Sequence, residues 1–269
     1  TAGLESDGRL CLAAETLAAW DEEAIERLWT DHAVRRLSII AYLASGLLQW
    51  NPGIREEEDE LERDIVGHDV YGAARHLHRP AMAFRRYTDW SDLTPEEQRF
   101  VRRVGWRAFA NVASPLLWGR GAWSLGAQRR FSVSLAYGLV PFGDAFEIHT
   151  WMARVNHWGM HAYGCAMQNR DAWFPSAGVR WADLASDRRF AVEVAAHVWQ
   201  QPENLAFDTA HGEWGGAVEG AVRLHLTRPT AQPALRLDVG VLAKSRGYLA
   251  EAPTLRRAIA PRVGCSLVF

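Results

Sequence analysis

The second half of the chain alternates apolar and polar residues with a period of two. Around residue 192, the apolar residues Phe190, Val192 and Val194 alternate with the charged residues Arg189 and Glu193. Period two turns successive side chains to opposite faces of a strand, so this pattern predicts strands with one apolar face each. We expect about eight such strands, in the segments 131–140, 145–155, 158–167, 177–184, 189–198, 218–226, 235–244 and 262–269.

The first half has the spacing of helices instead. Apolar residues from Leu17 to Leu28 recur at steps of three and four, which predicts one amphipathic helix. Asp31 is a candidate cap for a second helix that runs to Leu48. The run Thr94-Pro95-Glu96-Glu97 combines a cap hydroxyl, a proline and first-turn acids, and it predicts a helix start.

The balance of charge changes where the periodicity changes. Residues 1–128 hold 20 acidic residues against 15 arginines, whereas residues 129–269 hold 15 basic residues against 12 acidic ones. We therefore expect an α+β fold, with a helical domain over 1–128 and an antiparallel β-barrel over 129–269. The net charge of −2 and the mean hydropathy of −0.19 exclude a polytopic helical membrane protein and a strongly basic nucleic-acid-binding protein.

The connections between the expected strands alternate in length. Counted from the C-terminal end, long connections at 246–257, 200–216 and 168–176 alternate with short ones at 228–233, 185–188 and 156–157. Only the first connection, near Pro141, is short where a long one is expected. Short turns at one end and longer loops at the other are typical of transmembrane β-barrels, whose tilted strands need ~9–11 residues to cross a bilayer.

The last expected strand carries a more specific feature. Val263, Cys265 and Leu267 alternate with polar or small residues up to the final residue, Phe269. In this respect residues 129–269 resemble the bacterial outer-membrane β-barrel proteins, whose last strand alternates in this way and typically ends in Phe. The resemblance implies an integral protein of the Gram-negative cell outer membrane, in contact with outer-membrane lipid. Because the first residue is Thr1 rather than Met, we also expect a signal peptide to have been removed.

In such a barrel the apolar faces meet lipid, and the polar faces line the interior. The charges expected in the barrel interior are of both signs: Glu147, Arg189, Glu193, Glu219, Arg223, Arg236, Asp238 and Lys244. Side chains fill an eight-stranded barrel, so these charges should neutralise one another and leave no wide pore. Aromatic residues near the expected strand ends could form interfacial girdles; they include Tyr137, Trp151, Trp173, Trp181, Trp199 and Trp214.

The function expected from this fold is that of an envelope scaffold, or of a subunit in a larger assembly with other envelope proteins. The helical domain would lie in the periplasm or pack on the barrel. A soluble lipocalin-like module that binds a small ligand is an alternative, because a soluble barrel shows the same alternation. In that case the apolar faces would point inward, so the direction of Phe190, Val192 and Val194 distinguishes the two.

A polar stripe in the helical half is a candidate site. Asp64, His68, Tyr71 and Arg75 follow one another at steps of four, three and four, which places them on one helix face. They could form a polarised base beside an anion-binding arginine, or a buried network that docks the helix to its neighbours. One Asp and one His are too few ligands for a metal ion, so we expect no metal.

A lipid or lipopolysaccharide hydrolase of the outer membrane is a further alternative. The candidate catalytic residues are His211, Glu213 and Asp208, in the long connection 200–216, at the rim of the barrel. His149, His161 and His197 fall on interior strand faces instead. No G-x-S-x-G motif selects a serine nucleophile, so whether the protein is an enzyme stays open. Neither a phosphate-binding glycine loop nor a dinucleotide fingerprint occurs, and we expect no cofactor.

Overall fold

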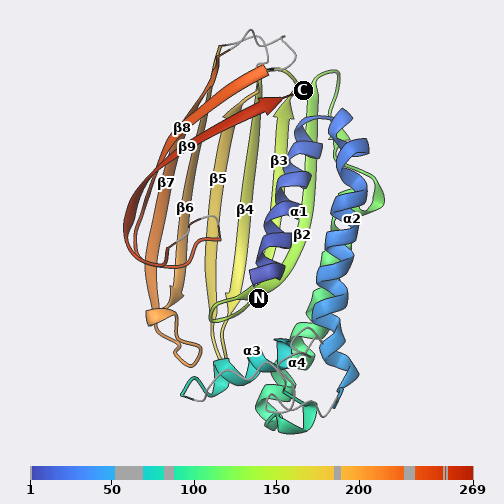
Figure 1. Cartoon of the computed structure of the whole chain (residues 1–269), viewed down its shortest axis with the longest axis vertical. Helices are drawn as coiled ribbons and strands as arrows, with labels where there is room; N and C mark the ends of the chain where they lie inside the picture. Colours follow the sequence, from blue (N-terminus) through green and yellow to red (C-terminus); the bar gives the residue numbers. More distant parts are fainter. Residues whose placement is uncertain are drawn as a thin grey trace.

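The computed structural model of the chain describes residues 2–51, 69–81, 88–184, 189–226, 234–250, 252 and 254–268. The fold is α+β: a helical region precedes a single antiparallel sheet, in which every strand pairs with the next one along the chain. The sheet is strongly curved, and the first helix lies against its inner side with the second helix next to it (Figure 1).

In the part of the helical region that the structure describes, there are four α-helices and several 3-10 turns. They are α1 (Ala2–Trp20), α2 (Glu23–Ala44), η1 (Ser45–Leu48), α3 (Asp69–His78), η2 (Trp90–Asp92), α4 (Pro95–Arg107), η3 (Ala108–Ala113) and η4 (Pro115–Trp118), and η5 (Glu203–Leu205) follows later in the chain. None of the described helices combines the length and the apolar composition needed to cross a bilayer.

Two helix boundaries differ from the prediction, and one agrees with it. The single helix expected over 17–28 is wrong, because the chain turns at Asp21, whose carboxylate accepts a hydrogen bond from the Glu23 N–H (3.0 Å). Helix α2 runs straight through Asp31, which binds Arg35 one turn later (2.8 Å) instead of capping a helix. The start at Thr94 is confirmed, since Thr94 and Glu97 form a reciprocal capping box before α4.

Nine strands form the sheet, in sequence order. They are β1 (Trp123–Ser124), β2 (Arg129–Val140), β3 (Gly143–Arg154), β4 (Trp158–Gln168), β5 (Trp173–Asp183), β6 (Phe190–Pro202), β7 (Gly212–His225), β8 (Ala234–Lys244) and β9 (Ala258–Val268). The eight long strands, β2 to β9, are those that the alternation predicted. The sheet is not closed: within the described residues β9 forms a ladder with β8 alone, and none with β1 or β2.

The apolar faces of the strands point outward. On β6, Phe190, Val192 and Val194 are 62%, 42% and 47% exposed, whereas Ala191 and Ala195, on the opposite face of the strand, are buried. Exposed apolar residues on the other strands continue this outer surface: Ile148, Met152, Val218, Val222, Val239, Val241, Ile259 and Val263. The inward Phe190/Val192/Val194 face that a soluble lipocalin-like barrel requires is therefore not the arrangement found.

Helical segments cover the free edge of β2. The side chain of Asn111, in η3, accepts from the backbone N–H of Tyr137 (3.1 Å) and donates to its carbonyl (2.9 Å). Arg36 of α2 binds the same Asn111 oxygen (2.7 Å) and the carboxylate of Glu15 on α1 (2.6 Å). Glu15 also contacts His32 and Ser114, so one buried network fastens α1, α2 and η3 to the edge of the sheet.

Helices α3 and α4 lie at one end of the sheet (Figure 1). Two arginines of α4, Arg103 and Arg107, bind the buried carboxylate of Asp144 at the start of β3 (2.6 and 2.7 Å). Tyr137 donates to the same carboxylate (3.0 Å). This ion cluster attaches the helical end of the molecule to the turn between β2 and β3.

Candidate functional site

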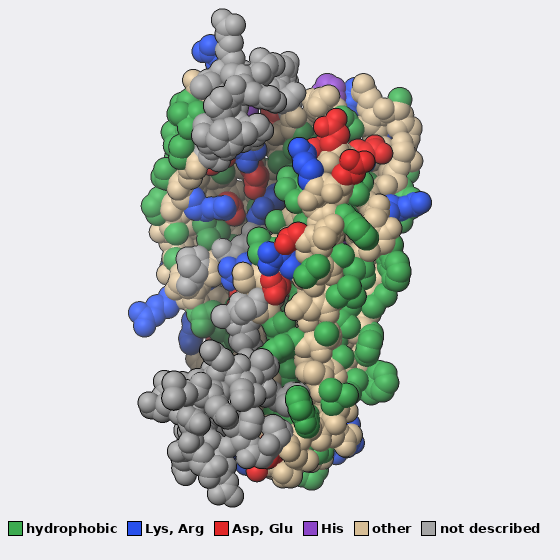
Figure 2. All heavy atoms as spheres, turned by 45° about the vertical axis from the view of Figure 1, so that its right-hand side comes forward, with side chains coloured by type: hydrophobic (Ala, Val, Ile, Leu, Met, Phe, Trp, Pro, Cys, Tyr) green, Lys and Arg blue, Asp and Glu red, His purple; other side chains and the backbone are tan. Residues whose placement is uncertain are grey.

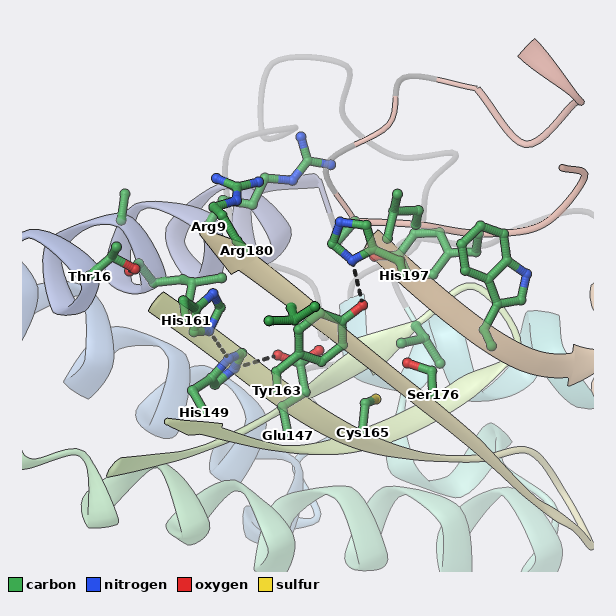
Figure 3. A pocket seen from close by; sticks show the side chains of 18 of the residues that line it. Arg9, Thr16, Glu147, His149, His161, Tyr163, Cys165, Ser176, Arg180 and His197 are labelled. Atoms are coloured by element: carbon green, nitrogen blue, oxygen red, sulfur yellow. Dashed lines mark hydrogen bonds and ion pairs between the residues drawn. The ribbon is translucent and has the colours of Figure 1, made fainter. Parts of the chain in front are cut away.

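A cavity of about 540 Å³ lies between α1 and the inner face of the sheet. Residues of β3, β4, β5 and β6 form one wall, and one face of α1 forms the opposite wall (Figure 3). The connection between β8 and β9 covers one end of the cavity with Tyr248, Leu249 and Ala250. Charged side chains gather in this hollow, as the space-filling view in Figure 2 shows, whereas much of the flanking surface is hydrophobic.

A hydrogen-bonded chain of three side chains lines the sheet wall. The carboxylate of Glu147 lies 3.0 Å from His149 Nε2, and His149 Nδ1 lies 3.0 Å from His161 Nε2 (Figure 3). With both rings neutral, the carboxylate requires a proton on His149 Nε2, so His149 Nδ1 accepts from His161. His161 Nδ1 is then a hydrogen-bond acceptor, and the chain fixes which tautomer the ring presents.

A second pair crosses one strand of the wall. Tyr163 on β4 and His197 on β6 meet above β5, with the phenol oxygen 3.0 Å from His197 Nδ1 (Figure 3). Gly178 is the β5 residue between them in the ladder, and a Cβ there would lie 2.6 Å from His197 Nδ1. The absence of a side chain at position 178 is therefore what allows the two rings to meet.

The expected interior charges lie mostly beside this wall and pair with opposite charges. Arg180 of β5 is within 3.4 Å of Glu193, and Glu219 lies between Arg180 and Arg262 of β9. Arg223 binds Asp238 (2.8 Å). Glu147, as described, is bonded to His149 within the cavity.

The three other predicted interior charges have different surroundings. Lys244 is buried and donates to the carbonyls of Gly247 and Thr254 (2.7 and 2.8 Å), so it holds the connection that covers the cavity rather than a carboxylate. Arg189 directly precedes β6 and is exposed. The side chain of Arg236 lies outside the described residues.

The connection between β8 and β9 is attached to α1 and β6. The Tyr248 phenol donates to Glu5 of α1 (3.2 Å), and its backbone N–H and carbonyl both bind the amide of Gln201 (2.7 and 2.6 Å). Burial, and then the neighbouring Glu5 carboxylate, raise the pKa of Tyr248, so the phenol stays protonated and keeps donating. These bonds hold the backbone and the side chain of Tyr248 in place over this end of the cavity.

The rim residues that the sequence analysis singled out are not bonded to one another. Asp208, His211 and Glu213 are all exposed near the connection between β6 and β7. Within the described part of the chain, no hydrogen bond or ion pair joins their side chains to one another; the His211 backbone N–H binds Thr209 Oγ1. Exposed polar residues in a loop need no chemical role.

The polar helical stripe is described only in part. Asp64 and His68 lie outside the described residues. Tyr71 is fully buried on α3, where its hydroxyl donates to the Gly46 carbonyl (3.2 Å) and accepts from the Trp50 N–H (3.2 Å). For Tyr71, these bonds correspond to a buried network that docks the helix to its neighbours, one of the two arrangements expected for the stripe. Arg75 lies in the last turn of the same helix.

Sequence reasoning missed the residues that α1 contributes. Arg9, Leu12, Ala13 and Thr16 line the cavity, and Thr16 accepts a hydrogen bond from the Trp151 indole (3.0 Å). Tyr137, Trp151 and Trp199 are buried, so the girdle expected for them is wrong, whereas Trp173, Trp181 and Trp214 are exposed. Among the described residues, no group of three or more His, Cys, Asp and Glu is arranged to hold a metal ion.

No protein-family model, curated protein or solved structure matches this chain.

Proposed function

We propose that this protein is an integral protein of the bacterial outer membrane, whose curved sheet crosses the bilayer with its outer face against lipid. It acts there as an envelope scaffold or as a subunit of a larger envelope assembly. The observation that carries this proposal is the polarity of the sheet, which is apolar outside and charged inside. A soluble protein would bury the first face and expose the second.

The outer face has the composition that lipid requires. On β6, β7 and β8 its middle residues are Val192, Val194, Val218, Val222, Val239 and Val241, all exposed. No charged residue interrupts this face between the ends of the three strands. A charged side chain in the same position of a bilayer costs about 2–4 kcal/mol, which accounts for that composition.

The exposed tryptophans of the sheet are spaced as expected for residues at the two interfaces of a bilayer. Trp173 and Trp214 lie near one end of the sheet, and Trp181 lies near the other end of β5. The eight residue steps from Trp173 to Trp181 span about 26 Å along the strand, at ~3.3 Å per residue. At the ~40° tilt of outer-membrane strands this is roughly 20 Å of height, which lies within their apolar band of ~25 Å. Apolar residues on the helices extend the apolar surface, since Trp29, Val34 and Leu37 of α2 are also exposed.

The interior supports a scaffold rather than a channel. Helix α1 and the paired charges occupy the space that the sheet encloses, and the connection carrying Tyr248 covers one end of it. A wide aqueous pore needs an empty lumen. The protein we propose is therefore anchored in the membrane by its sheet and does not transport large solutes.

Membrane integration is tested by liposome flotation and by resistance to alkaline extraction. We expect the full chain to float with liposomes and to need detergent for release. Val194→Arg places a charge in the middle of the outer face and should lower the integrated fraction several-fold. The control His211→Arg adds the same charge at the exposed loop and should float like the wild type. Purification of the folded wild-type protein from the soluble fraction without detergent would overturn the proposal.

A further inference from the structure

We propose that the cavity binds a single-chain amphiphile with an anionic head group, which enters from the bilayer through the gap between α1 and β9. This inference rests on the proposed membrane location. It adds to that location a ligand class and a site, formed by α1, the sheet wall and β9.

The cavity is open on the side where the sheet is not closed. Arg9 and Leu17 on α1 and Arg262 on β9 all line it, and all three are also exposed. Side chains that both line a cavity and reach the surface mark its entrance, so the entrance lies between α1 and β9. The hollow with charged side chains in Figure 2 lies in this region of the surface.

Pro261 keeps this entrance free of a further strand. Proline has no N–H, and within sheets it occurs where the missing donor faces away from the ladder. Pro261 pairs with Val241 of β8, so the missing donor falls in the middle of the outer edge of β9. A strand that tried to pair there would lose a hydrogen bond, and proline is one of the devices that prevent edge pairing.

Part of the lining is apolar. Leu12 of α1, Met167 of β4, Trp199 of β6 and Leu249 of the covering connection form this part. Trp199 and Met167 are almost completely buried and belong to the packed interior of the sheet. A volume of about 540 Å³ falls within the ~300–1,000 Å³ of small-molecule pockets, which suits one acyl chain and its head group.

The charged lining favours an anion. Among the described residues, three guanidinium groups, those of Arg9, Arg180 and Arg262, line the cavity, against one lining carboxylate. That carboxylate, Glu147, is already bonded to His149. The other acidic partners that the described residues supply, Glu5, Glu193 and Glu219, do not line the cavity: Glu5 binds Arg9, and Glu193 and Glu219 bind Arg180 and Arg262. A guanidinium group carries five N–H donors, so these pairs leave donors for an anionic ligand. Guanidinium groups match the oxygens of carboxylates and phosphates in geometry as well as in charge.

The guanidinium groups come from both walls. Arg9 of α1 and Arg180 of β5 both line the cavity, and in the view of Figure 3 both are drawn on the side of His161. A head group placed between them would also reach the polar face formed by His161 and Tyr163. The chain would then lie toward Met167 and Trp199, so polar and apolar parts of the cavity are separated as they are in an amphiphile.

Four ligands with the same twelve-carbon chain test the head-group specificity. The purified full chain in a nonionic detergent is titrated with dodecanoate, dodecyl phosphate, dodecanol and dodecyltrimethylammonium, and bound ligand is counted by native mass spectrometry. We expect at least one of the two anions to bind about tenfold more tightly than the alcohol and the cation, since a hydrogen bond to a charged group contributes that much. Comparison of the two anions identifies a carboxylate or a phosphate head.

Two substitutions on exposed positions of α1 locate the site without disturbing the core. Ala13→Trp fills the cavity and should abolish binding of the preferred anion, whereas Leu10→Trp, an exposed neighbour that does not line the cavity, should bind like the wild type. Arg9→Gln should weaken binding of the anion about tenfold and leave dodecanol unchanged.

The outcomes separate this inference from the proposed function. Equal affinity for all four ligands, or wild-type binding by Ala13→Trp, would overturn the inference even if the protein floats with liposomes. A protein that fails to float but binds the anion at this site would overturn the membrane location and leave a soluble anion-binding cavity. Preference for the cation would reverse the assignment of the charged lining.

Discussion

The two edges of the sheet are treated in opposite ways. On β2, the backbone N–H and carbonyl of Tyr137 are both bonded to Asn111, and β1 pairs with the strand near Phe131. On β9, no partner other than β8 occurs within the described residues, and Ile259 and Val263 are 78% and 74% exposed. One edge is sealed by side chains of the helical region, and the other is left bare with a proline in its middle.

The difference shows how a sheet that is not closed into a barrel can still deal with the unpaired backbone groups of its two edges. Unpaired backbone groups are costly in lipid, so an edge must be paired, covered or turned toward a polar space. The β2 edge is covered by a helical segment whose amide replaces a neighbouring strand. The β9 edge borders the charged cavity, and it is the side through which we propose that a ligand enters. The helices thus complete the wall on one side only.

The largest expected effect comes from breaking the sealed edge at Glu15. Glu15→Gln removes the carboxylate from Arg36 and His32, which are 3% and 0% exposed. Loss of one partner of a buried ion pair typically costs about 3–5 kcal/mol, because the remaining charge stays buried. Urea titration of the protein in detergent measures this loss. Glu26→Gln, on an exposed part of α2, should change stability by less than about 0.5 kcal/mol.

A double substitution sharpens that test. In Glu15→Gln/Arg36→Met, no unpaired charge is left, so the double variant should be more stable than Glu15→Gln alone. If the double variant were equally unstable, the network would act through shape and packing rather than through its charges.

A smaller loss is expected from the amide that replaces the missing strand. Asn111→Ala leaves the Tyr137 N–H and carbonyl without their partner and removes one of the two partners of Arg36. Unsatisfied buried groups cost about 1–3 kcal/mol. Hydrogen exchange should show faster exchange of the Tyr137 amide, whereas Gln128→Ala, which removes an exposed amide, should leave it protected. Unchanged protection in Asn111→Ala would mean that the edge is sealed by other groups.

The sequence predicted the strands well and the edges poorly. Alternation located β2 to β9 because successive side chains of a strand point to opposite faces, so a difference in polarity between the faces is visible in the local sequence. How the edges of the sheet are covered depends instead on contacts between residues far apart in the sequence. Asn111 is an isolated amide between apolar residues, and nothing in its neighbours indicates that it will meet Tyr137, 26 positions later. The single helix expected over 17–28 is wrong for a related reason, since α1 and α2 are separate elements that pack side by side.

The cavity could be predicted only in part. The inward direction of His149, His161 and His197 follows from alternation, but their meeting with Glu147 and Tyr163 depends on the register between strands. The contribution of Arg9 depends on α1 lying inside the curved sheet, which is a tertiary property. One available signal was Gly178, a glycine at an inward position between polar strands, where a Cβ would separate Tyr163 from His197.

The bare edge can be tested by removing its proline. Pro261→Thr restores a backbone donor in the middle of the outer edge of β9, and we expect the chain to associate through this strand. Sedimentation in detergent should show a dimer for Pro261→Thr and a smaller species for the wild type. Val263→Thr changes a neighbouring side chain without adding a donor and should sediment like the wild type. Stability should change by less than about 1 kcal/mol, so association is the main readout.

The smallest expected effect concerns the helical end, and it depends on pH. Burial against Phe100 and Phe207 lowers the pKa of His78 below its ordinary value of 6.5, although its bond to the Ala74 carbonyl (2.7 Å) offsets part of this. The fold therefore favours the neutral ring. Its stabilisation is complete above pH 6.5 and is lost as the pH falls through the folded-state pKa. Hydrogen exchange in α3 should accelerate on acidification.

A pair of substitutions on the same helix isolates that effect. His78→Gln removes the buried titrating ring and should make exchange in α3 less dependent on pH, whereas His76→Gln removes an exposed ring and should leave the dependence as it is. The β2 edge should respond to neither substitution, because Asn111 and Tyr137 are held by groups on other elements. If the Tyr137 amide lost protection together with α3, the sealed edge and the helical end would open as one unit. The contrast between the two edges would then depend on the whole helical region rather than on Asn111.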